Sequence, residues 1–421
     1  MRPLLLTAAL AAGLLLAGAG GAQPGPSKAA ELLRLSAEGA AAREKGDAEG
    51  YLAAARGLLA LGPDHPILRS AWARALAFAG RDEEAIGVLK DLADAGFGLS
   101  ERDRGLLEPL KRHPDFAAVD ARLKANLEPR GKVGSEIVLD RRDLVPEGVV
   151  WDAKRRAYYV GSLVDGGLYE VGPDGRTRVL HRETQPNRST VGLRLARSGQ
   201  LFACSSPQQE TATDKLSQLL SLDPAAAAPE VRRTVLPAGP DNAYCNDMVE
   251  VPDGRLVITD FDARRLSVRR PDGSITAFAP EADFFFPNGI AASPDGRRIY
   301  VADFFGVTVI DGAGKVLGRL QPPPGESLGG LDGLYEHRGW LIGVQGVTAP
   351  ARLIRARLGP GLTVSRVEVL AANHPSLADA TTATLTPEGL RVLARTGLRG
   401  MSKGKAAADA AAPALVLVPL D

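Results

Sequence analysis

The sequence predicts an all-β six-bladed β-propeller preceded by a small all-α helical domain. Two observations carry this prediction. First, the composition changes near residue 130. The chain before it is rich in Ala, Leu, Glu, Lys and Arg at helical spacing, and the chain after it is rich in Val, Gly, Pro and Asp-Gly turns. Second, the later region repeats a strand-turn-strand pattern about every 40 to 60 residues, close to the length of a four-stranded blade.

The first 22 residues have the features of a signal peptide. Arg2 gives a charged start, and residues 4–16 form an apolar core that is too short to span a bilayer. The small residues at 17–22 suit cleavage. We therefore expect residues 1–22 to be removed, the mature protein to be periplasmic or secreted, and no membrane span to remain. An uncleaved anchor is the alternative.

Residues 27–129 contain an internal helical repeat. Gly46 and Gly80 lie about 34 residues apart, and each is followed by a second apolar-periodic segment, at 51–59 and 85–92. Glycine suits the tight turn between two helices. This region resembles the tetratricopeptide repeat, a helix-turn-helix unit of the same period. The resemblance implies a groove for a protein partner, while a domain that packs on the propeller and steadies it is an equal alternative.

The second region, residues 131–421, contains six predicted hairpins, many of them joined by Pro-Asp-Gly or Ser-Gly turns. They cover residues 151–160, 193–202, 249–258, 290–301, 334–342 and 382–393. Two further strands, at 135–139 and 414–418, have no blade of their own. We expect both to complete the sixth blade, because this would close the ring and protect its edges.

Oxygen-bearing side chains open most of these blades. Glu147, Asn246, Asn288 and Asp332 each stand directly before an apolar strand, and Thr190 and Thr381 are assigned to the second and sixth blades. Equivalent points of a radial repeat can converge on one axis. Carboxylate and amide oxygens there would suit a hard cation such as Ca²⁺. The alternative is that each residue caps a local turn through nearby amides.

The segments around these residues resemble the gluconolactonase / senescence-marker-protein-30 / luciferin-regenerating family. The resemblance rests on residues 147–152, 246–254, 286–303 and 331–334, in this order and at blade spacing. It implies a six-bladed propeller with one divalent metal ion on its axis, bound by Glu147, Asn288 and Asp332, with Asn246 binding the metal or its water. Ca²⁺ is expected first, with Zn²⁺, Mn²⁺ or Mg²⁺ as alternatives. The implied activity is hydrolysis of a lactone or related ester, with Asp332 as the catalytic residue.

The chain departs from the family pattern next to Asn246. Tyr244 stands where members that hydrolyse sugar lactones usually carry Arg, and Met248 stands where they usually carry Gly. We therefore assign Asn246 and Tyr244 to substrate binding. The phenylalanines at 284–286 and 304–305 are expected to make the mouth of the site apolar. The substrate would accordingly be a less polar lactone or ester than a sugar lactone.

Other classes of function are disfavoured or remain open. A net charge of +1 argues against a nucleic-acid partner, and no Gly-x-Ser-x-Gly motif indicates a serine hydrolase. A non-catalytic propeller is the alternative, with a structural metal and a ligand or protein partner bound through the propeller face and the helical repeats. A propeller like strictosidine synthase is a third possibility. Cys204 and Cys245 could form a disulfide if they lie at the same end of adjacent blades, or remain free thiols.

Overall fold

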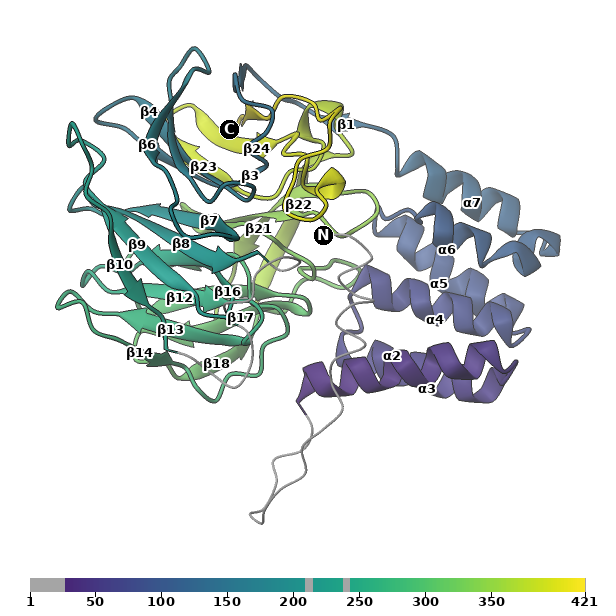
Figure 1. The fold of residues 1–421 in the computed structure, drawn as a ribbon. Coiled ribbons are helices and arrows are strands. Elements are labelled where there is room, and N and C mark those ends of the chain that lie inside the picture. The colour runs from purple at the N-terminus through teal and green to yellow at the C-terminus, as the bar shows by residue number, and fades with distance from the viewer. Residues whose placement is uncertain (1–26, 209–214, 238–242, 421) are drawn as a thin grey trace.

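A computed structural model describes residues 27–208, 215–237 and 243–420 of the chain. The predicted signal peptide at residues 1–22 lies outside these ranges. No helix within them is long and apolar enough to cross a membrane. The architecture is a helical region followed by a six-bladed propeller, as the sequence predicts (Figure 1).

The helical region consists of two helix hairpins and a shorter C-terminal part. The hairpins turn at Gly46 and Gly80, whose φ angles of 74° and 72° lie in the left-handed region that glycine adopts without steric cost. Two hairpin helices begin at capping side chains, since Ser27 accepts from the amide of Ala30 and Asp47 from that of Gly50. The helices are α2 (Lys28–Glu44), α3 (Ala48–Leu61), α4 (Pro66–Phe78), α5 (Asp82–Asp94), α6 (Glu101–Gly105), the 3₁₀ helix η1 (Glu108–Arg112) and α7 (Phe116–Ala125).

Four antiparallel strands form each of the first four blades, with the first strand of each blade innermost. Blade 1 contains β3 (Pro146–Asp152), β4 (Ala157–Ser162), β5 (Leu168–Val171) and β6 (Thr177–His181). Blade 2 contains β7 (Arg188–Leu195), β8 (Leu201–Pro207), β9 (Gln218–Leu222) and β10 (Arg232–Val235). Blade 3 contains β11 (Cys245–Glu250), β12 (Leu256–Asp260), β13 (Arg265–Arg269) and β14 (Ile275–Phe278). Blade 4 contains β15 (Ile290–Ala292), β16 (Arg298–Asp303), β17 (Gly306–Asp311) and β18 (Val316–Arg319).

The last two blades also use strands from the start of the propeller region. Blade 5 contains β19 (Leu334–His337), β20 (Trp340–Gln345), β21 (Arg352–Leu358) and β22 (Val364–Ala372), with β1 (Arg130–Gly131) added at its outer edge. Blade 6 contains β23 (Ala383–Thr386), β24 (Gly389–Ala394) and β25 (Ala414–Val418), and β2 (Glu136–Val138) is its outer strand. Ile137 pairs with Leu415. The predicted closure of the ring through the sixth blade is therefore confirmed.

One apolar cluster fills each interface between neighbouring blades. For example, Tyr159 and Leu168 of blade 1 pack with Leu201 and Leu220 of blade 2, and similar clusters occupy the other five interfaces. Because each blade is apolar on both faces, it is stable only between two neighbours. The core of the propeller is thus a closed ring of six clusters.

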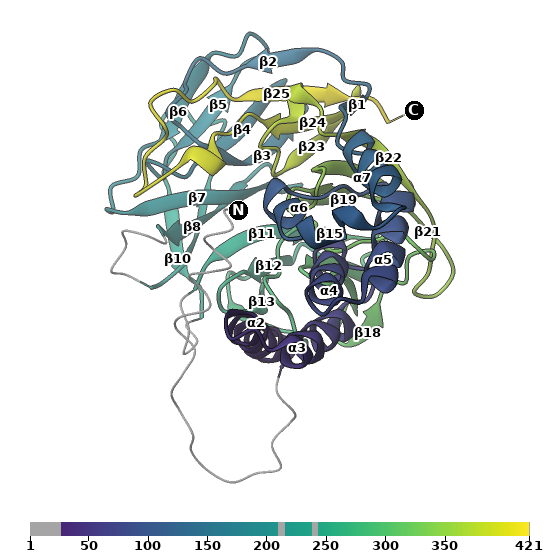
Figure 2. The same cartoon turned by 90° about the vertical axis from the view of Figure 1, so that its right-hand side faces the viewer.

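The helical region is packed on the face of the propeller where the innermost strands begin. Ala29 and Leu32 of α2 contact Phe285, with Phe304 and Phe305 packed around them. Figure 2 shows the helices in an arc in front of one side of the ring. At the other end of the arc, the amide of Gly98 donates to the carbonyl of Ala349 at 2.7 Å. The packing role expected as one alternative for this region is therefore observed.

His65 lies at the centre of this contact. Its side chain is 2% exposed, its ring stacks on Phe304 at a centroid distance of 4.2 Å, and its Nδ1 accepts from the amide of Ile67. Burial lowers the pKa of His65 to about 3. The imidazole is therefore neutral in the folded protein under ordinary conditions.

We predict that this histidine makes the folded protein less stable in mild acid. The unfolded chain takes up a proton at His65 below about pH 6.5, whereas the folded chain does so only near the lowered pKa. The stability that His65 contributes is therefore complete above pH 6.5 and is lost as the pH falls toward 3. This group alone should lower the free energy of unfolding by about 2 kcal/mol between pH 7 and pH 5.

Urea denaturation of the wild type and of His65→Asn at several pH values would check this prediction. Asparagine keeps an acceptor for the helix cap but does not titrate, so the variant should lose this part of the pH dependence. His374→Asn is a matched control, because His374 also accepts from an amide two residues later and is not fully buried. An unchanged pH dependence in His65→Asn would contradict the prediction.

Candidate metal centre

The innermost strands place the predicted ligands at one level of the propeller axis. Glu147, Asn246, Asn288 and Asp332 each lie two residues before an apolar residue paired with the second strand of the same blade: Val149, Met248, Ile290 and Leu334. Their side chains therefore occupy equivalent positions in four of the six blades.

The register corrects one assignment made from the sequence. In blade 2, Leu193 is the paired residue, so the equivalent position is Val191 and not Thr190. Thr190 is buried, and its hydroxyl donates to the carbonyl of Gly166 at 2.6 Å. Blade 2 thus contributes an apolar side chain at this level. In blade 6 the equivalent residue is Thr381, as expected.

A cavity of about 310 Å³ runs along the innermost strands and brings the four predicted ligands together. Glu147, Asn246, Asn288 and Asp332 all line it. Asn246 and Asn288 are each 8% exposed. The cavity therefore combines two carboxylates and two amides, drawn from blades 1, 3, 4 and 5.

The two carboxylates, Glu147 and Asp332, are partly buried in the same cavity. Burial, followed by the negative charge of Asp332, raises the pKa of Glu147 above its ordinary value. Burial also raises the pKa of Asp332, although a hydrogen bond with Asn288 opposes this. Among the described residues, the buried Oε2 atom of Glu147 has no hydrogen-bond partner. Two neighbouring carboxylates in such a site are stabilised in their charged form by a bound cation.

These donors fit a hard divalent cation. Such ions take oxygen ligands from carboxylates, amides and water. Within the described ranges, no group of three or more His, Cys, Asp or Glu side chains is arranged to hold a metal ion. A metal here would therefore depend on the amide oxygens of Asn288 and Asn246 in addition to the carboxylates of Glu147 and Asp332.

Asp247 also lines the cavity, and the sequence analysis did not select it. It occupies the position after the ligand level, where four other blades have glycine: Gly148, Gly192, Gly289 and Gly333. Burial raises the pKa of Asp247 to about 7, although its hydrogen bond from the amide of Met248, at 2.7 Å, opposes this. Alignment of the six blades could have identified Asp247, because it is a carboxylate at a position where four other blades have glycine.

Hydrogen bonds between blades hold the backbone at the ligand level. The hydroxyl of Thr259 accepts from the amide of Asp247 at 3.0 Å and donates to the carbonyl of Asn288 at 2.9 Å. The amide of Gly289 then donates to the carbonyl of Asp332 at 2.8 Å. Three consecutive blades are thereby joined through the residues that line the site.

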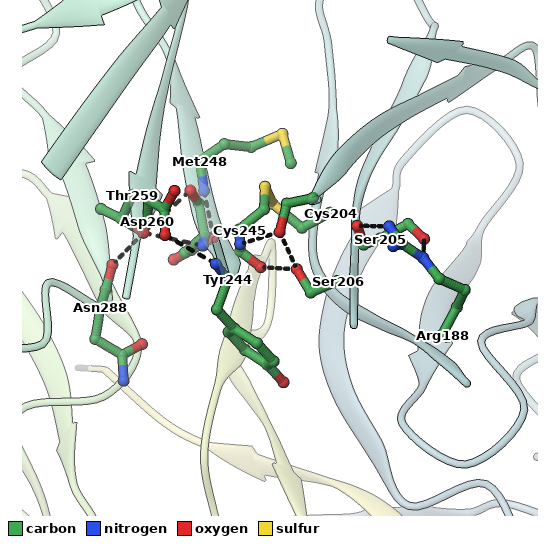
Figure 3. Close-up of a disulfide and its surroundings, with 12 residues drawn as sticks. Arg188, Cys204, Ser205, Ser206, Tyr244, Cys245, Met248, Thr259, Asp260 and Asn288 are labelled. Carbon is green, nitrogen blue, oxygen red and sulfur yellow. Dashed lines mark hydrogen bonds between the residues drawn. A yellow bond between two sulfur atoms is a disulfide. The ribbon is translucent and has the colours of Figure 1, made fainter. Parts of the chain in front are cut away.

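A disulfide joins the second and third blades beside Asn246. Cys204 of β8 is bonded to Cys245 of β11, with their Cα atoms 5.3 Å apart, which settles the question left open by the sequence (Figure 3). The amide of Cys245 donates to the hydroxyl of Ser217, and its carbonyl accepts from Ser206. Because Cys245 directly precedes Asn246, these contacts fix the strand that presents this predicted ligand.

Tyr244 lies beside the site but does not line the cavity. Its amide donates to Oδ1 of Asp260, and its ring makes an edge contact with Phe261. Burial, and after it the charges of Glu147, Asp262 and Asp332, raise the pKa of the Tyr244 phenol. In Figure 3 its ring and the amide of Asn288 extend to the same side of the strand, away from Met248. Its assigned role in substrate binding remains a prediction.

The expected apolar mouth is not observed. Phe285, Phe304 and Phe305 pack with the helical region, and Phe284 lies in the core between blades 3 and 4. Phe286 stacks on Phe261 at a centroid distance of 4.5 Å. None of the five lines the cavity. Phe285, Phe304 and Phe305 lie close together because they form the contact between the propeller and the helical region.

Comparison with known proteins agrees with the class of protein that this fold and site define. Residues 145–311 match the model of a family described as SMP-30/Gluconolactonase/LRE-like region. The matched segment contains Glu147, Asn246 and Asn288, and Asp332 lies beyond it. The resemblance indicated by the motifs is therefore confirmed for this part of the propeller. No curated protein matches the chain.

Solved structures with a similar arrangement are distant in sequence. The calcium-binding protein regucalcin from Agrobacterium tumefaciens str. C58 is 17% identical, with a TM-score of 0.47, over 68% of this chain and 94% of that one. A gluconolactonase from Xanthomonas campestris is 16% identical, with a TM-score of 0.45, over 69% of this chain and 100% of that one. Virginiamycin B lyase from Staphylococcus aureus is 14% identical, with a TM-score of 0.45, over 64% and 83%.

We predict that the hydroxyl of Thr259 supports metal binding without touching the metal. Thr259→Val keeps the shape of the side chain but leaves the carbonyl of Asn288 and the amide of Asp247 without this partner. Loss of these hydrogen bonds should cost about 1 to 2 kcal/mol, which corresponds to a Kd for Ca²⁺ about 5 to 30 times higher. Thr259→Ser keeps the hydroxyl and should bind Ca²⁺ nearly as the wild type does. Titration calorimetry with Ca²⁺ measures both, and equal affinities for the two variants would refute the supporting role.

We also predict that the disulfide contributes measurably to stability. The bond closes a loop with a sequence separation of 41 residues, and loop-closure entropy predicts a contribution of roughly 4 kcal/mol. The double variant Cys204→Ala, Cys245→Ala should therefore have a lower guanidinium midpoint than the wild type under oxidising conditions. Under reducing conditions the two proteins should become similar. A wild-type midpoint that does not respond to a reductant would contradict this prediction.

Proposed function

We propose that this protein is an exported metal-dependent hydrolase that opens lactones or cleaves related esters. The observation that carries the proposal is the pair of partly buried carboxylates, Glu147 and Asp332, which line a cavity on the propeller axis beside two amides. The family match over residues 145–311, whose description includes gluconolactonase, supports the same class of reaction.

The residues of the chain divide into binding and catalytic roles. Glu147, Asn288 and Asp332, with Asn246 beside them, would hold one divalent ion, with Ca²⁺ expected first because the donors are all oxygens. When bound, this ion supplies a Lewis acid for the carbonyl of the substrate. Asp332 accepts the proton of the attacking water, and the hydrogen bond with Asn288 orients its carboxylate. Water adds to the carbonyl carbon, the acyl–oxygen bond breaks, and the proton passes to the departing oxygen, which gives a hydroxy acid.

Export is proposed from two features. Residues 1–22 have the composition of a signal peptide, and the chain contains a disulfide between Cys204 and Cys245. Disulfides persist mainly in oxidising compartments. A periplasmic or secreted location accounts for both.

We predict that removal of the Asp332 carboxylate abolishes turnover while the fold persists. Asp332→Ala should lower kcat/KM by a factor of about 100 to 10,000, the range expected for loss of a general base, and should weaken Ca²⁺ binding. Hydrolysis of a lactone panel would be followed after chelation and after adding back Ca²⁺, Zn²⁺, Mn²⁺ or Mg²⁺ singly. Asp409→Ala, which removes an exposed carboxylate, is the control and should retain full activity.

The same variant separates catalysis from a structural metal. If the metal only stabilises a binding propeller, no lactone is turned over by the wild type, and Asp332→Ala loses the Ca²⁺-dependent rise in Tm that mass action produces. Full activity in Asp332→Ala would disprove the catalytic assignment. Faster turnover of a sugar lactone than of an aliphatic one would show that Tyr244 does not exclude polar substrates.

A further inference from the structure

The cavity has a second polar end, which the proposed reaction does not use. Arg194 lies on β7, three residues beyond the ligand-level position Val191, and lines the same cavity as the carboxylates. Its Nε is buried and makes no hydrogen bond within the described part of the chain. Burial lowers the pKa of this guanidinium, and the charges of Asp247 and Glu250 oppose that effect without a hydrogen bond to it. The Nε–H of Arg194 is therefore a buried donor without an acceptor among the described residues.

A second hydrogen-bond donor without an acceptor lies at this end. Trp151 of β3 also lines the cavity, and its Nε1 is buried with no partner among the described residues. Its ring packs against Tyr158 at a centroid distance of 4.6 Å, which holds the indole in place. Arg194 and Trp151 come from the far ends of the innermost strands of adjacent blades. Two unpaired donors of this kind are costly to bury unless an acceptor binds there.

The cavity is therefore polarised along its length. The carboxylates of Glu147 and Asp332 lie at the start of the innermost strands. Arg194 lies three residues farther along its strand, and three residues of a strand span about 10 Å. The extended side chain of an arginine shortens the gap between the two sets of groups. A small elongated molecule can thus contact both.

We propose that the Arg194 end of the cavity binds a carboxylate, with Trp151 as a second donor, and that the substrate is a lactone carrying a terminal carboxylate. The assignment of the lactone rests on the proposed function, whereas the carboxylate site itself does not. A guanidinium forms charge-assisted hydrogen bonds with a carboxylate that are stronger than neutral ones. The ring carbonyl lies at the acidic end, and the carboxylate reaches Arg194 at the other end.

The test compares γ-butyrolactones whose side chains of one to three methylenes end in a carboxylate or in the neutral carboxamide. The wild type should hydrolyse the best carboxylate at least ten times more efficiently than its carboxamide, mainly through a lower KM. Arg194→Met should remove this preference, and Arg194→Lys should retain part of it. Arg197→Met is the matched control, since Arg197 is exposed and paired with Glu250 at 3.7 Å, and it should leave the preference unchanged.

A binding measurement separates this inference from the proposed function. Glutarate should bind the metal-free wild type in calorimetry, and Arg194→Met should raise its Kd at least tenfold. Trp151→Phe, which keeps an aromatic ring but loses the N–H, should raise the Kd severalfold and covers the case in which Arg194→Met does not fold. Glutarate binding without turnover of any lactone would defeat the proposed reaction and leave the carboxylate site standing. Equal turnover of carboxylate and carboxamide, or glutarate binding that is unchanged in both variants, would overturn the inference.

Discussion

The close approach of the innermost strands around the axis is the constraint on which the rest of the structure depends. A Cβ at Gly148 would lie 1.9 Å from the carbonyl oxygen of Val191, and one at Gly289 would lie 2.1 Å from that of Asp332. At these glycines, neighbouring blades therefore touch backbone to backbone, which a residue with a Cβ would prevent. The same approach allows the amide of Gly289 to bond Asp332 and that of Gly333 to bond Thr381. The residue before each glycine is thereby fixed in position on the axis.

This constraint holds only if the ring is closed. Each blade supplies half of two apolar clusters, so an open ring would expose apolar surface on two blades. Closure is achieved by β2, which comes from the start of the propeller region and pairs with β25 from its end. The disulfide between Cys204 and Cys245 adds a covalent link between blades 2 and 3. The candidate metal centre thus depends on contacts distributed around the whole propeller.

The sequence predicted the fold and the equivalent placement of Glu147, Asn246, Asn288 and Asp332 because both follow from local repetition. Hairpin turns and the oxygen-bearing residues before four of the innermost strands are visible without tertiary structure. The assignment of Thr190 failed because Thr190 is equivalent to Pro146 and Cys245, one residue before the ligand level, and Val191 takes the place of Glu147 and Asn246. Asp247, Arg194 and the five phenylalanines were missed or misread for another reason. Their roles depend on which blade, helix or cavity lies opposite, and the spacing of residues along the chain does not contain that information.

The direction of the innermost strands explains how one cavity acquires two chemically different ends. All six innermost strands run in the same direction along the axis. The position of a residue along its strand therefore determines how deep in the cavity its side chain lies. At the first level lie Glu147, Asn246, Asn288 and Asp332, and at the next level four of the six blades have glycine. Arg194 lies beyond the glycine of its own strand, Gly192. A cationic side chain at the first level would compete with a metal ion for the carboxylates of Glu147 and Asp332. A cationic side chain about 10 Å deeper can instead bind the opposite end of the small molecule in the cavity. The separation of charge along the cavity is therefore a consequence of strand direction, and it sets both the orientation and the length of any molecule that spans the two ends.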